Sequence, residues 1–239
     1  MTKWSMVIDL DKCVACQGCS MACRFENNTP VVSPDEAALG RSIFWNDVFP
    51  LRSEEESAIA SGQAKFLTRP CMHCEDPPCT KVCPVGATYQ DTEGIVRQNY
   101  TRCIGCRLCT VACPYGVRYF NWYEPTWEES LERHLTPDQI EGRAVSEGPS
   151  IRPKGVVEKC TFCVHRLFKE RDRAAAEERE FRTEDFVPAC VQTCTAKSRY
   201  FGDLDNPNST VSQLAQSRRA FRLLEEAGTH PKIIYLHEG

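Results

Sequence analysis

The sequence predicts an α+β protein with little regular secondary structure, built around metal-binding cysteines. The first observation behind this fold class is the cysteine content, sixteen in 239 residues. The second is that the strand-like segments are short. The third is that two long connections, 24–68 and 121–158, interrupt the chain. A small core of this kind is held largely by metal ligation, so the metal-free chain should fold poorly.

The cysteines form four motifs of four, with none left over. Every motif begins with a two-residue gap and ends with a three-residue gap, while the middle gap is two, four, two and twenty-six residues in turn. Motif four is therefore motif two with a long loop inserted. The motifs are Cys13, Cys16, Cys19, Cys23; Cys71, Cys74, Cys79, Cys83; Cys103, Cys106, Cys109, Cys113; and Cys160, Cys163, Cys190, Cys194.

Three kinds of cysteine chemistry compete for these motifs. Disulfides suit short secreted chains, and the first ten residues carry no secretion signal. Structural zinc uses two separated Cys-x2-Cys pairs, which runs of three cysteines do not resemble. Iron–sulfur clusters fit, because the bacterial ferredoxin run has these gaps and a proline after its last cysteine. Cys83-Pro84 and Cys113-Pro114 keep that proline, whereas Cys23-Arg24 and Cys194-Thr195 do not.

The ferredoxin pattern also predicts which cysteines share a cluster, because the last cysteine of each run ligates the other cluster. Motifs two and three share the proline and should exchange their last cysteines. Motifs one and four remain and should exchange theirs. The prediction is four [4Fe–4S] clusters: Cys13, Cys16, Cys19 with Cys194; Cys160, Cys163, Cys190 with Cys23; Cys71, Cys74, Cys79 with Cys113; and Cys103, Cys106, Cys109 with Cys83.

This exchange predicts two interleaved ferredoxin-like units and requires the two ends of the chain to meet. The outer unit comprises residues 1–65 plus 150–239, with motifs one and four. The inserted unit comprises residues 66–125, with motifs two and three. Residues 126–149 form the connecting loop.

Cations stand just before each motif: Lys12, Arg69, Arg102 and Lys159. Sixteen thiolates and four cluster cores add a charge of about −8 to the formal charge of −4. Nearby cations would offset that charge and tune the reduction potentials. The alternative is that they are ordinary solvated surface residues.

Two histidines and two glycines accompany the motifs. His73 and His165 lie beside cysteines, and we expect them to surround the clusters rather than ligate iron, because four thiolates are available for each cluster. Gly18 and Gly105 lie inside the tight loops, where a backbone without a Cβ can approach sulfur.

Local patterns predict the remaining elements. Residues 210–228 have the spacing of an amphipathic helix ending at Gly228, and residues 166–184 that of a charged, solvent-facing helix. The long connections, one with the acidic run Glu54–Glu56 and the other with aromatics such as Trp127, are candidates for interfaces. The predicted strands are 5–10, 94–98, 118–122, 199–202 and 232–236.

Composition and motifs exclude several functions. A formal charge of −4 and a pI of about 5.8 give no indication of nucleic-acid binding. No run of eighteen apolar residues could span a bilayer. The first residues lack a signal peptide and a twin-arginine pair, so the chain should stay in the cytoplasm or be exported folded with a partner. No Gly-x-Gly dinucleotide loop and no nucleophile–base pair occur.

Two alternatives to a bound electron-transfer subunit remain. A radical enzyme needs three cysteines at gaps of three and then two, but Glu26, Gly86 and Gly116 stand where its third cysteine would be. A free polyferredoxin shuttle is compatible with an acidic chain. The two long connections favour a bound partner instead, and gel filtration would separate these two possibilities.

The chain resembles the iron–sulfur subunit of molybdopterin oxidoreductase complexes, as in polysulfide, tetrathionate and dimethyl sulfoxide reductases and membrane-bound sulfite dehydrogenases. The likeness covers nearly the whole chain. It is carried by Cys13 to Cys23, Cys71-Met72-His73-Cys74-Glu75-Asp76-Pro77-Pro78-Cys79, Cys103 to Pro114, Lys159-Cys160-Thr161-Phe162-Cys163 and Pro188-Ala189-Cys190.

The resemblance implies two ferredoxin-like halves with four [4Fe–4S] clusters in a line and no substrate site in this chain. It implies a catalytic partner with a molybdenum bis-pterin cofactor and an integral membrane subunit that exchanges electrons with quinone. The chain would then lie at the membrane through its partners, with the cytoplasmic side favoured over the periplasmic side. Sulfite or another sulfur compound is the expected substrate of the complex.

Overall fold

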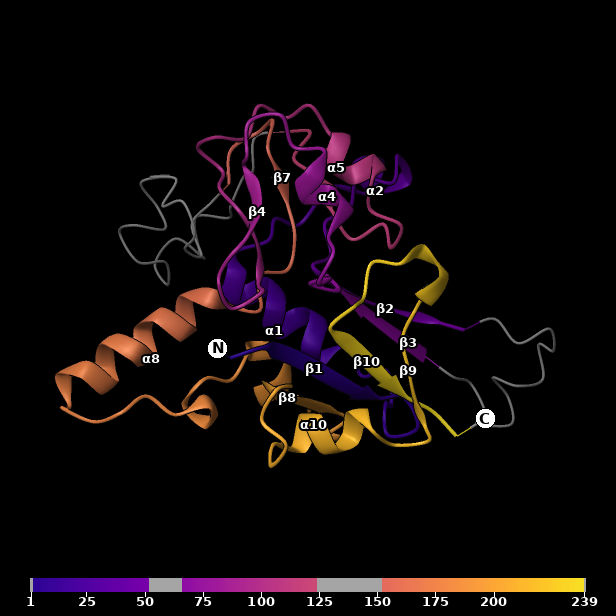
Figure 1. Ribbon diagram of the computed structural model, residues 1–239. Helices are drawn as coiled ribbons and strands as arrows, with labels where there is room; N and C mark the ends of the chain where they lie inside the picture. The colour runs from indigo at the N-terminus through magenta and orange to yellow at the C-terminus, as the bar shows by residue number, and fades with distance from the viewer. Residues whose placement is uncertain (1, 52–65, 124–151, 239) are drawn as a thin grey trace.

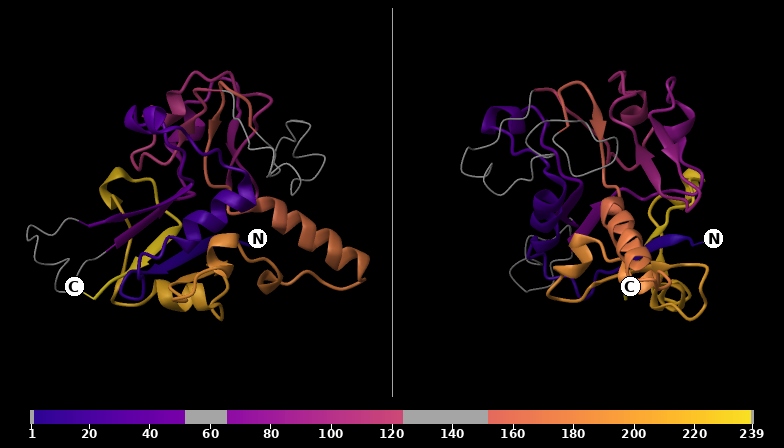
Figure 2. Two further views of the ribbon diagram at one scale, coloured as in Figure 1. Left: turned by 180° about the vertical axis from the view of Figure 1, so that it is seen from behind. Right: turned by 90° about the vertical axis from the view of Figure 1, so that its left-hand side faces the viewer.

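The computed structural model describes residues 2–51, 66–123 and 152–238. Figure 1 shows that segments from both ends of the chain form the lower part of the molecule, around one sheet. Residues of motifs two and three, drawn in magenta, lie above it in both views of Figure 2. The mixture of short helices and small sheets confirms the α+β class.

A four-stranded sheet joins the two ends of the chain. Its order is β8 (Arg199–Asp203), β1 (Trp4–Asp9), β10 (Ile233–Leu236) and β9 (Ala220–Phe221). Strand β1 pairs parallel with β10 and antiparallel with β8. The two ends of the chain therefore lie side by side, as the cysteine pairing requires.

All six residues of β1 are buried because both faces of the sheet are covered. Trp4, Met6 and Ile8 belong to the main core. Val7 faces the other way and packs with Val211 of α10 (Thr210–Ala215). The strand predicted over residues 5–10 is therefore a buried central strand of its sheet.

Three two-stranded pairs complete the sheets of the described residues. Strand β2 (Asn46–Pro50) lies within the first connection and pairs with β3 (Phe66–Pro70), which begins at the end of that connection. Strands β4 (Thr88–Gln90) and β5 (Val96–Gln98) form a hairpin between motifs two and three. Strand β6 (Tyr119–Phe120) pairs with β7 (Val157–Glu158).

Each motif places its third cysteine on a short helix. These helices are α1 (Gly18–Asn27), α4 (Pro78–Lys81), α5 (Leu108–Val111) and α9 (Ala189–Gln192). The last cysteine follows the third by four residues, which is about one helical turn, so the two cysteines point to the same side of the helix. Further helical segments of the described residues include α2 (Pro34–Ala38) and the 3₁₀ turns η1 (Thr183–Asp185) and η2 (Glu225–Ala227).

The helix predicted over residues 210–228 is wrong beyond its first turns. Ser209 caps α10 by accepting from the backbone of Ser212, but this helix ends at Ala215. Ala220 and Phe221 instead pair with β10 as an edge strand, opposite Leu236 and Tyr235. Apolar residues at helical spacing therefore form a strand here, because pairing with a distant strand outweighs a weak local preference for helix.

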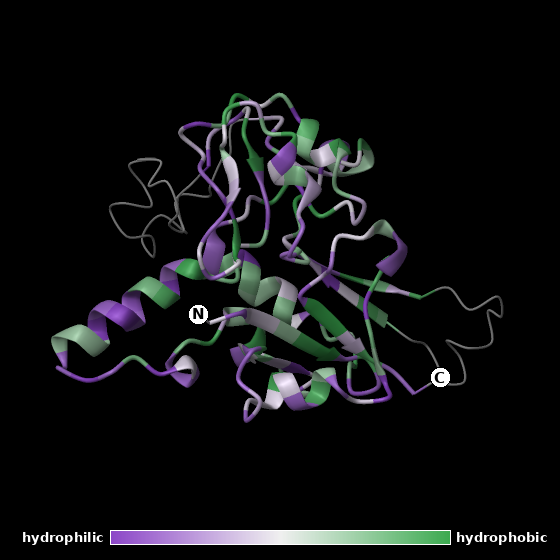
Figure 3. Cartoon of the chain, in the orientation of Figure 1, coloured by the Kyte–Doolittle hydropathy of each residue, from purple (hydrophilic) through white to green (hydrophobic). Residues whose placement is uncertain are grey.

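The charged helix predicted over 166–184 is present but shorter. Helix α8 (Val164–Ala176) buries Val164, Leu167 and Ala174 on one side and extends away from the sheet (Figure 1). Figure 3 shows hydrophilic segments recurring along its length. Within the described residues, no helix is both long and apolar enough to cross a bilayer.

The predicted strands agree with the structure to within a few residues, although 118–122 forms only the two-residue β6. Gly94 has a φ of 75° and makes the turn before β5, so the strand predicted to begin there begins at Val96. The acidic run Glu54–Glu56, Trp127 and the predicted connecting loop 126–149 lie outside the described residues.

Candidate metal centres

The first cysteine site joins both ends of the chain. Cys13, Cys16, Cys19 and Cys194 line one pocket, which we call site 1. The loop wraps around it because Ala15 and Gln17 adopt positive φ values of 52° and 58°.

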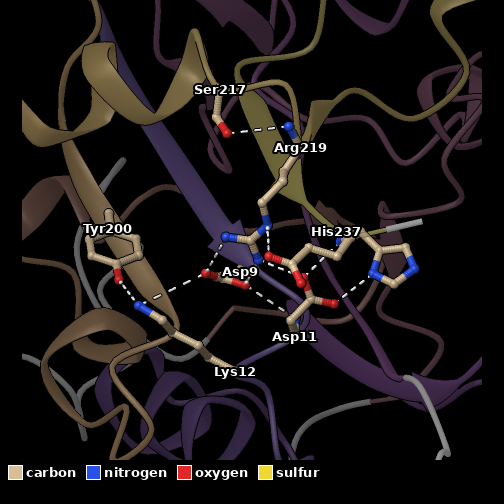
Figure 4. Close-up of polar contacts among 8 residues, drawn as sticks. Asp9, Asp11, Lys12, Tyr200, Ser217, Arg219 and His237 are labelled. Atoms are coloured by element: carbon tan, nitrogen blue, oxygen red, sulfur yellow. Dashed lines mark hydrogen bonds and ion pairs between the residues drawn. The ribbon is translucent and has the colours of Figure 1, made fainter.

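A polar clamp holds this loop at the C-terminal strand (Figure 4). Arg219 donates to Asp9 Oδ1 at 2.8 Å and to Asp11 Oδ2 at 2.5 Å, and His237 contacts Asp11 Oδ1 at 2.6 Å. Burial raises the pKa of Asp11, but Arg219 and His237 outweigh it and lower that pKa to about 2. Because Asp11 lies two residues before Cys13, the clamp fixes where motif one begins.

A second group, site 2, consists of Cys23, Cys160, Cys163 and Cys190, all of which are buried. The Asn27 side-chain nitrogen lies 3.6 Å from Cys23 Sγ and 3.8 Å from Cys163 Sγ, which ties motif one to motif four. Burial raises the pKa of the Cys23 thiol strongly, and the charges of Cys160, Cys163 and Cys190 raise it further. Such thiols ionise only when a metal takes the proton's place.

Site 3 brings motifs two and three together. Cys71, Cys74, Cys79 and Cys113 line one pocket, closed by the prolines of the Pro77-Pro78 element. Burial raises the pKa of Cys74 to about 12, and the neighbouring charge of Cys71 contributes to that increase. This is the set that the exchange of last cysteines predicts.

The remaining four cysteines, Cys83, Cys103, Cys106 and Cys109, make up site 4. Helix α4, which precedes Cys83, packs against α5, which carries Cys109. Cys103 packs beside Cys109 in one apolar cluster. The structure thus brings the two motifs together here, whereas the ligation of one cluster by all four thiols stays a prediction.

The four sites follow one another through the molecule. Burial raises the pKa of Cys190, and Cys19 of site 1 is among the neighbours that raise it further. Burial likewise raises the pKa of Cys160, to which Cys71 of site 3 contributes. Cys79 of site 3 packs in one cluster with Cys109 of site 4. Cys19, Cys190, Cys160 and Cys71 also belong to one packed core cluster, which supports the order site 1, site 2, site 3 and site 4.

The surroundings of the sulfurs fit clusters. Cluster sulfurs accept hydrogen bonds from nearby N–H groups. Sites 1, 2 and 4 each have such a donor within hydrogen-bond distance of a cysteine sulfur. The nitrogen-to-sulfur distances are 3.2 Å from Asn46 Nδ2 to Cys19, 3.4 Å from Thr88 N to Cys83, 3.4 Å from Ser198 N to Cys194 and 3.5 Å from Phe162 N to Cys160.

The two glycines predicted to approach sulfur behave differently. A Cβ on Gly105 would lie 2.1 Å from the carbonyl oxygen of Gly155, and its φ is +68°, so both space and backbone require glycine there. The requirement comes from a neighbouring backbone rather than from sulfur. A Cβ on Gly18 would lie at an ordinary 3.6 Å from Cys16 Sγ.

The four predicted cations do not share one environment. Lys12 is exposed and donates to the Tyr200 hydroxyl at 2.8 Å. Arg69 pairs loosely with Asp47, and Arg102 is exposed. Only Lys159 is fully buried, where its ammonium group donates to the carbonyl of Cys160 at 2.7 Å and to that of Val96.

The two predicted histidines contact protein groups. His73 is fully buried, accepts from the Val96 N–H at 3.1 Å and stacks on Phe162 with ring centroids 3.7 Å apart. Burial, and then the charges of Lys159 and Lys232, hold its pKa well below the usual value. His165 contacts Glu26 at 2.6 Å.

Sequence reasoning missed two buried arginines. Arg118 lines the pocket of site 3, and Arg199 lines the pocket of site 1. A signal was available, because each arginine stands five residues after the last cysteine of its motif and is followed by Tyr-Phe.

Four groups of four cysteines, with N–H donors to their sulfurs and buried cations beside them, define an iron–sulfur protein of the ferredoxin-like class. Consistent with this class, residues 63–131 match the family model of the 4Fe-4S dicluster domain.

The relatives cover nearly the whole chain. It is 45% identical to the iron–sulfur cluster-binding subunit of menaquinone reductase from Nitratidesulfovibrio vulgaris, over 98% of this chain and 88% of the relative. It is 40% identical to a subunit of selenate reductase from Mesobacillus selenatarsenatis, over 98% and 72%. It is 38% identical to the iron–sulfur subunit of arsenate respiratory reductase from a Shewanella species, over 97% and 94%.

The chain therefore belongs to the family of iron–sulfur subunits of oxidoreductase complexes. Its part in such a complex is electron transfer and not substrate chemistry. The resemblance stated from the sequence is confirmed. The cofactors are [4Fe–4S] clusters, and sixteen cysteines match four of them.

Proposed function

We propose that this chain relays electrons through four [4Fe–4S] clusters between a molybdenum bis-pterin catalytic subunit and a quinone-reactive membrane subunit. The observation that carries the proposal is the consecutive order of the four cysteine sites. Adjacent sites whose cysteines belong to the same packed clusters form a continuous route for electrons.

Exposure along the route supports this function. Site 2, in the middle, has only buried cysteines, whereas sites 1 and 4 at the ends each contain an exposed one, Cys16 and Cys106. Exposed apolar residues accompany both, such as Val14 beside site 1 and Ile104 beside site 4. Electrons would enter and leave at the ends, while the middle is insulated from water and oxidants.

The ligand sets and the units that hold them are part of the proposal. We assign one cluster to each of sites 1 to 4, as defined above. The pairing of β1 with β10 supports an outer unit of residues 1–65 plus 150–239 around an inserted unit of residues 66–125. In both units, cluster binding would supply much of the folding free energy.

The partners follow from the relatives. One relative is named as part of a menaquinone reductase, and others as parts of selenate and arsenate reductases. We propose membrane association through such a partner, with the cytoplasmic side favoured and the periplasmic side as the alternative. Sulfite or another sulfur compound stays our predicted substrate for the complex.

Isolation of the tagged chain from its native membranes, without oxygen, tests the proposal. We expect a complex that contains molybdenum, and reduced clusters that a soluble menaquinone analogue reoxidises. The isolated chain should react far more slowly with the analogue, because the quinone-reactive subunit is missing. A lone species of 27.1 kDa that exchanges electrons freely would contradict the proposal and support the polyferredoxin shuttle.

A further inference from the structure

The segments after motifs three and four repeat each other. Cys113 and Cys194 are each followed, five residues later, by Arg-Tyr-Phe, beginning at Arg118 and Arg199. In both cases a strand begins there, β6 at Tyr119 and β8 at Arg199. The turn that ends each motif therefore delivers an arginine to the same position relative to its last cysteine.

Arg118 is buried, with 6% of its surface exposed. Its Nη2 donates to Thr88 Oγ1 at 2.8 Å and to Gln98 Oε1 at 2.6 Å. Its Nε and Nη1 are buried without an acceptor among the described residues. The charged neighbours of this guanidinium in the described chain are cysteines, and it lines the pocket of site 3.

Arg199 is buried to a similar extent, with 4% exposed. Its Nη2 donates to Asn46 Oδ1 at 2.7 Å, and its Nη1 lies 3.6 Å from Met6 Sδ. Both partners are neutral, and this arginine lines the pocket of site 1. The positive charge of Arg199 therefore also interacts mainly with the cysteines of that pocket.

Each arginine lies near cysteines of two sites. Arg118 lines the pocket of site 3, and Cys79 of that pocket packs with Cys109 of site 4. Arg199 lines the pocket of site 1, and Cys190 of site 2, which belongs to the same packed core cluster as Cys19, is a further neighbour of its guanidinium.

We propose that Arg118 and Arg199 are equivalent positioning cations, one between the two clusters of each unit, that raise the reduction potentials of both neighbouring clusters. A cluster gains negative charge when it is reduced, and a buried cation stabilises that state. The effect is strong because low-dielectric surroundings screen charges little. This inference rests on the proposed four-cluster function and deepens it.

Redox titration of the purified holoprotein, followed by electron paramagnetic resonance (EPR), tests the inference with R118Q, R118K, R199Q and R199K. R118Q should lower the potentials of the clusters at sites 3 and 4 and leave sites 1 and 2 unchanged. R199Q should do the reverse. We expect the reduced-to-oxidised ratio at a fixed potential to fall about tenfold, which is 59 mV for one electron. Both lysine variants should stay near the wild type.

Exposed Arg102 provides the matched control, because it lies beside Cys103 but water screens its charge. R102Q should shift the potentials much less than R118Q. Unchanged potentials in R118Q and R199Q with full iron content, or equal shifts at all four sites, would overturn the proposal. If a glutamine variant loses iron, its lysine counterpart decides: wild-type potentials support a role of charge, and lowered potentials reject it.

Iron content of the wild type separates this inference from the proposed function. A wild type without four clusters would refute the four-cluster relay, whatever the arginine variants do. If the wild type holds four clusters and their potentials do not change in the arginine variants, the proposed relay stands and only the role of the two cations is rejected.

Discussion

The side chain of Asn46 donates to the sulfur of Cys19 at 3.2 Å. The oxygen of the same amide accepts from Arg199 at 2.7 Å. Arginine only donates, so the amide must present its oxygen to Arg199 and its N–H groups to sulfur. The first long connection therefore supplies a buried hydrogen bond to a cysteine of site 1.

This bond predicts a lower potential for the cluster at site 1 in Asn46→Leu. Hydrogen bonds to sulfur stabilise the more negative, reduced cluster. A loss of about 0.5–1.5 kcal/mol corresponds to a fall of roughly 20–60 mV for one electron. EPR-monitored redox titration measures it, and an unchanged potential at site 1 would show that this bond does not tune the cluster.

The proposed ligand exchange predicts which cysteine variants resemble each other. Cys113→Ser should change the EPR signal that Cys74→Ser changes, because both thiols line site 3. Cys106→Ser should change a different signal, although it shares motif three with Cys113. If Cys113→Ser and Cys106→Ser alter the same signal, the exchange does not occur.

A buried ion pair predicts a large loss of stability. Arg152 and Glu158 pair with side chains 1% and 0% exposed, and Glu158 also accepts from Trp45 Nε1 at 3.1 Å and Asn121 Nδ2 at 3.2 Å. Arg152→Met leaves the carboxylate buried without its cation. We expect a cost of about 3–5 kcal/mol, measured as a lower guanidinium concentration for unfolding and loss of cluster absorbance.

The control for this variant is Arg173→Met on α8. Arg173 also pairs with a glutamate, Glu177, but its side chain is 64% exposed. An exposed pair contributes about 0–1 kcal/mol, so this variant should unfold close to the wild type. Equal losses in both variants would contradict a special contribution from the buried pair.

Glu26 predicts a stability that depends on pH. Burial raises its pKa, but hydrogen bonds from Arg166 and His165 outweigh burial and lower the pKa to about 2, from 4.5. A carboxyl whose folded pKa is depressed stabilises the fold above its unfolded pKa, and this contribution is lost as pH falls from about 4.5 towards 2.

Glu26→Gln should therefore cost roughly 1–3 kcal/mol at pH 7, and the difference from the wild type should shrink below about pH 4.5. Thermal unfolding of both proteins at each pH, followed by circular dichroism, measures the difference. Acid loss of clusters affects both proteins and cancels in the comparison. A difference that stays constant down to pH 3 would contradict the linkage to Glu26.

The cysteine motifs could be predicted from the sequence, because their spacing is local and set by the geometry of a cluster. The meeting of the two chain ends could also be predicted, because it follows from pairing motif one with motif four. The prediction failed over residues 210–228, where Phe221 pairs with Tyr235 of a later strand. Local periodicity does not contain that long-range contact.

Burial explains the other differences. Lys12 and Lys159 precede their motifs identically, yet only Lys159 is buried, because carbonyls of Val96 and Cys160 meet its ammonium group. Arg118 and Arg199 both begin an Arg-Tyr-Phe repeat, but the sequence does not show that each arginine lines a cysteine pocket. The sequence alone does not show which cations water screens.

Iron and acid-labile sulfide per chain, measured on anaerobically purified protein, test the central claim most directly. Four [4Fe–4S] clusters predict about sixteen of each, with interacting cubane signals in the reduced EPR spectrum. About four zinc ions without sulfide would contradict the relay and leave the cysteines as a structural metal scaffold.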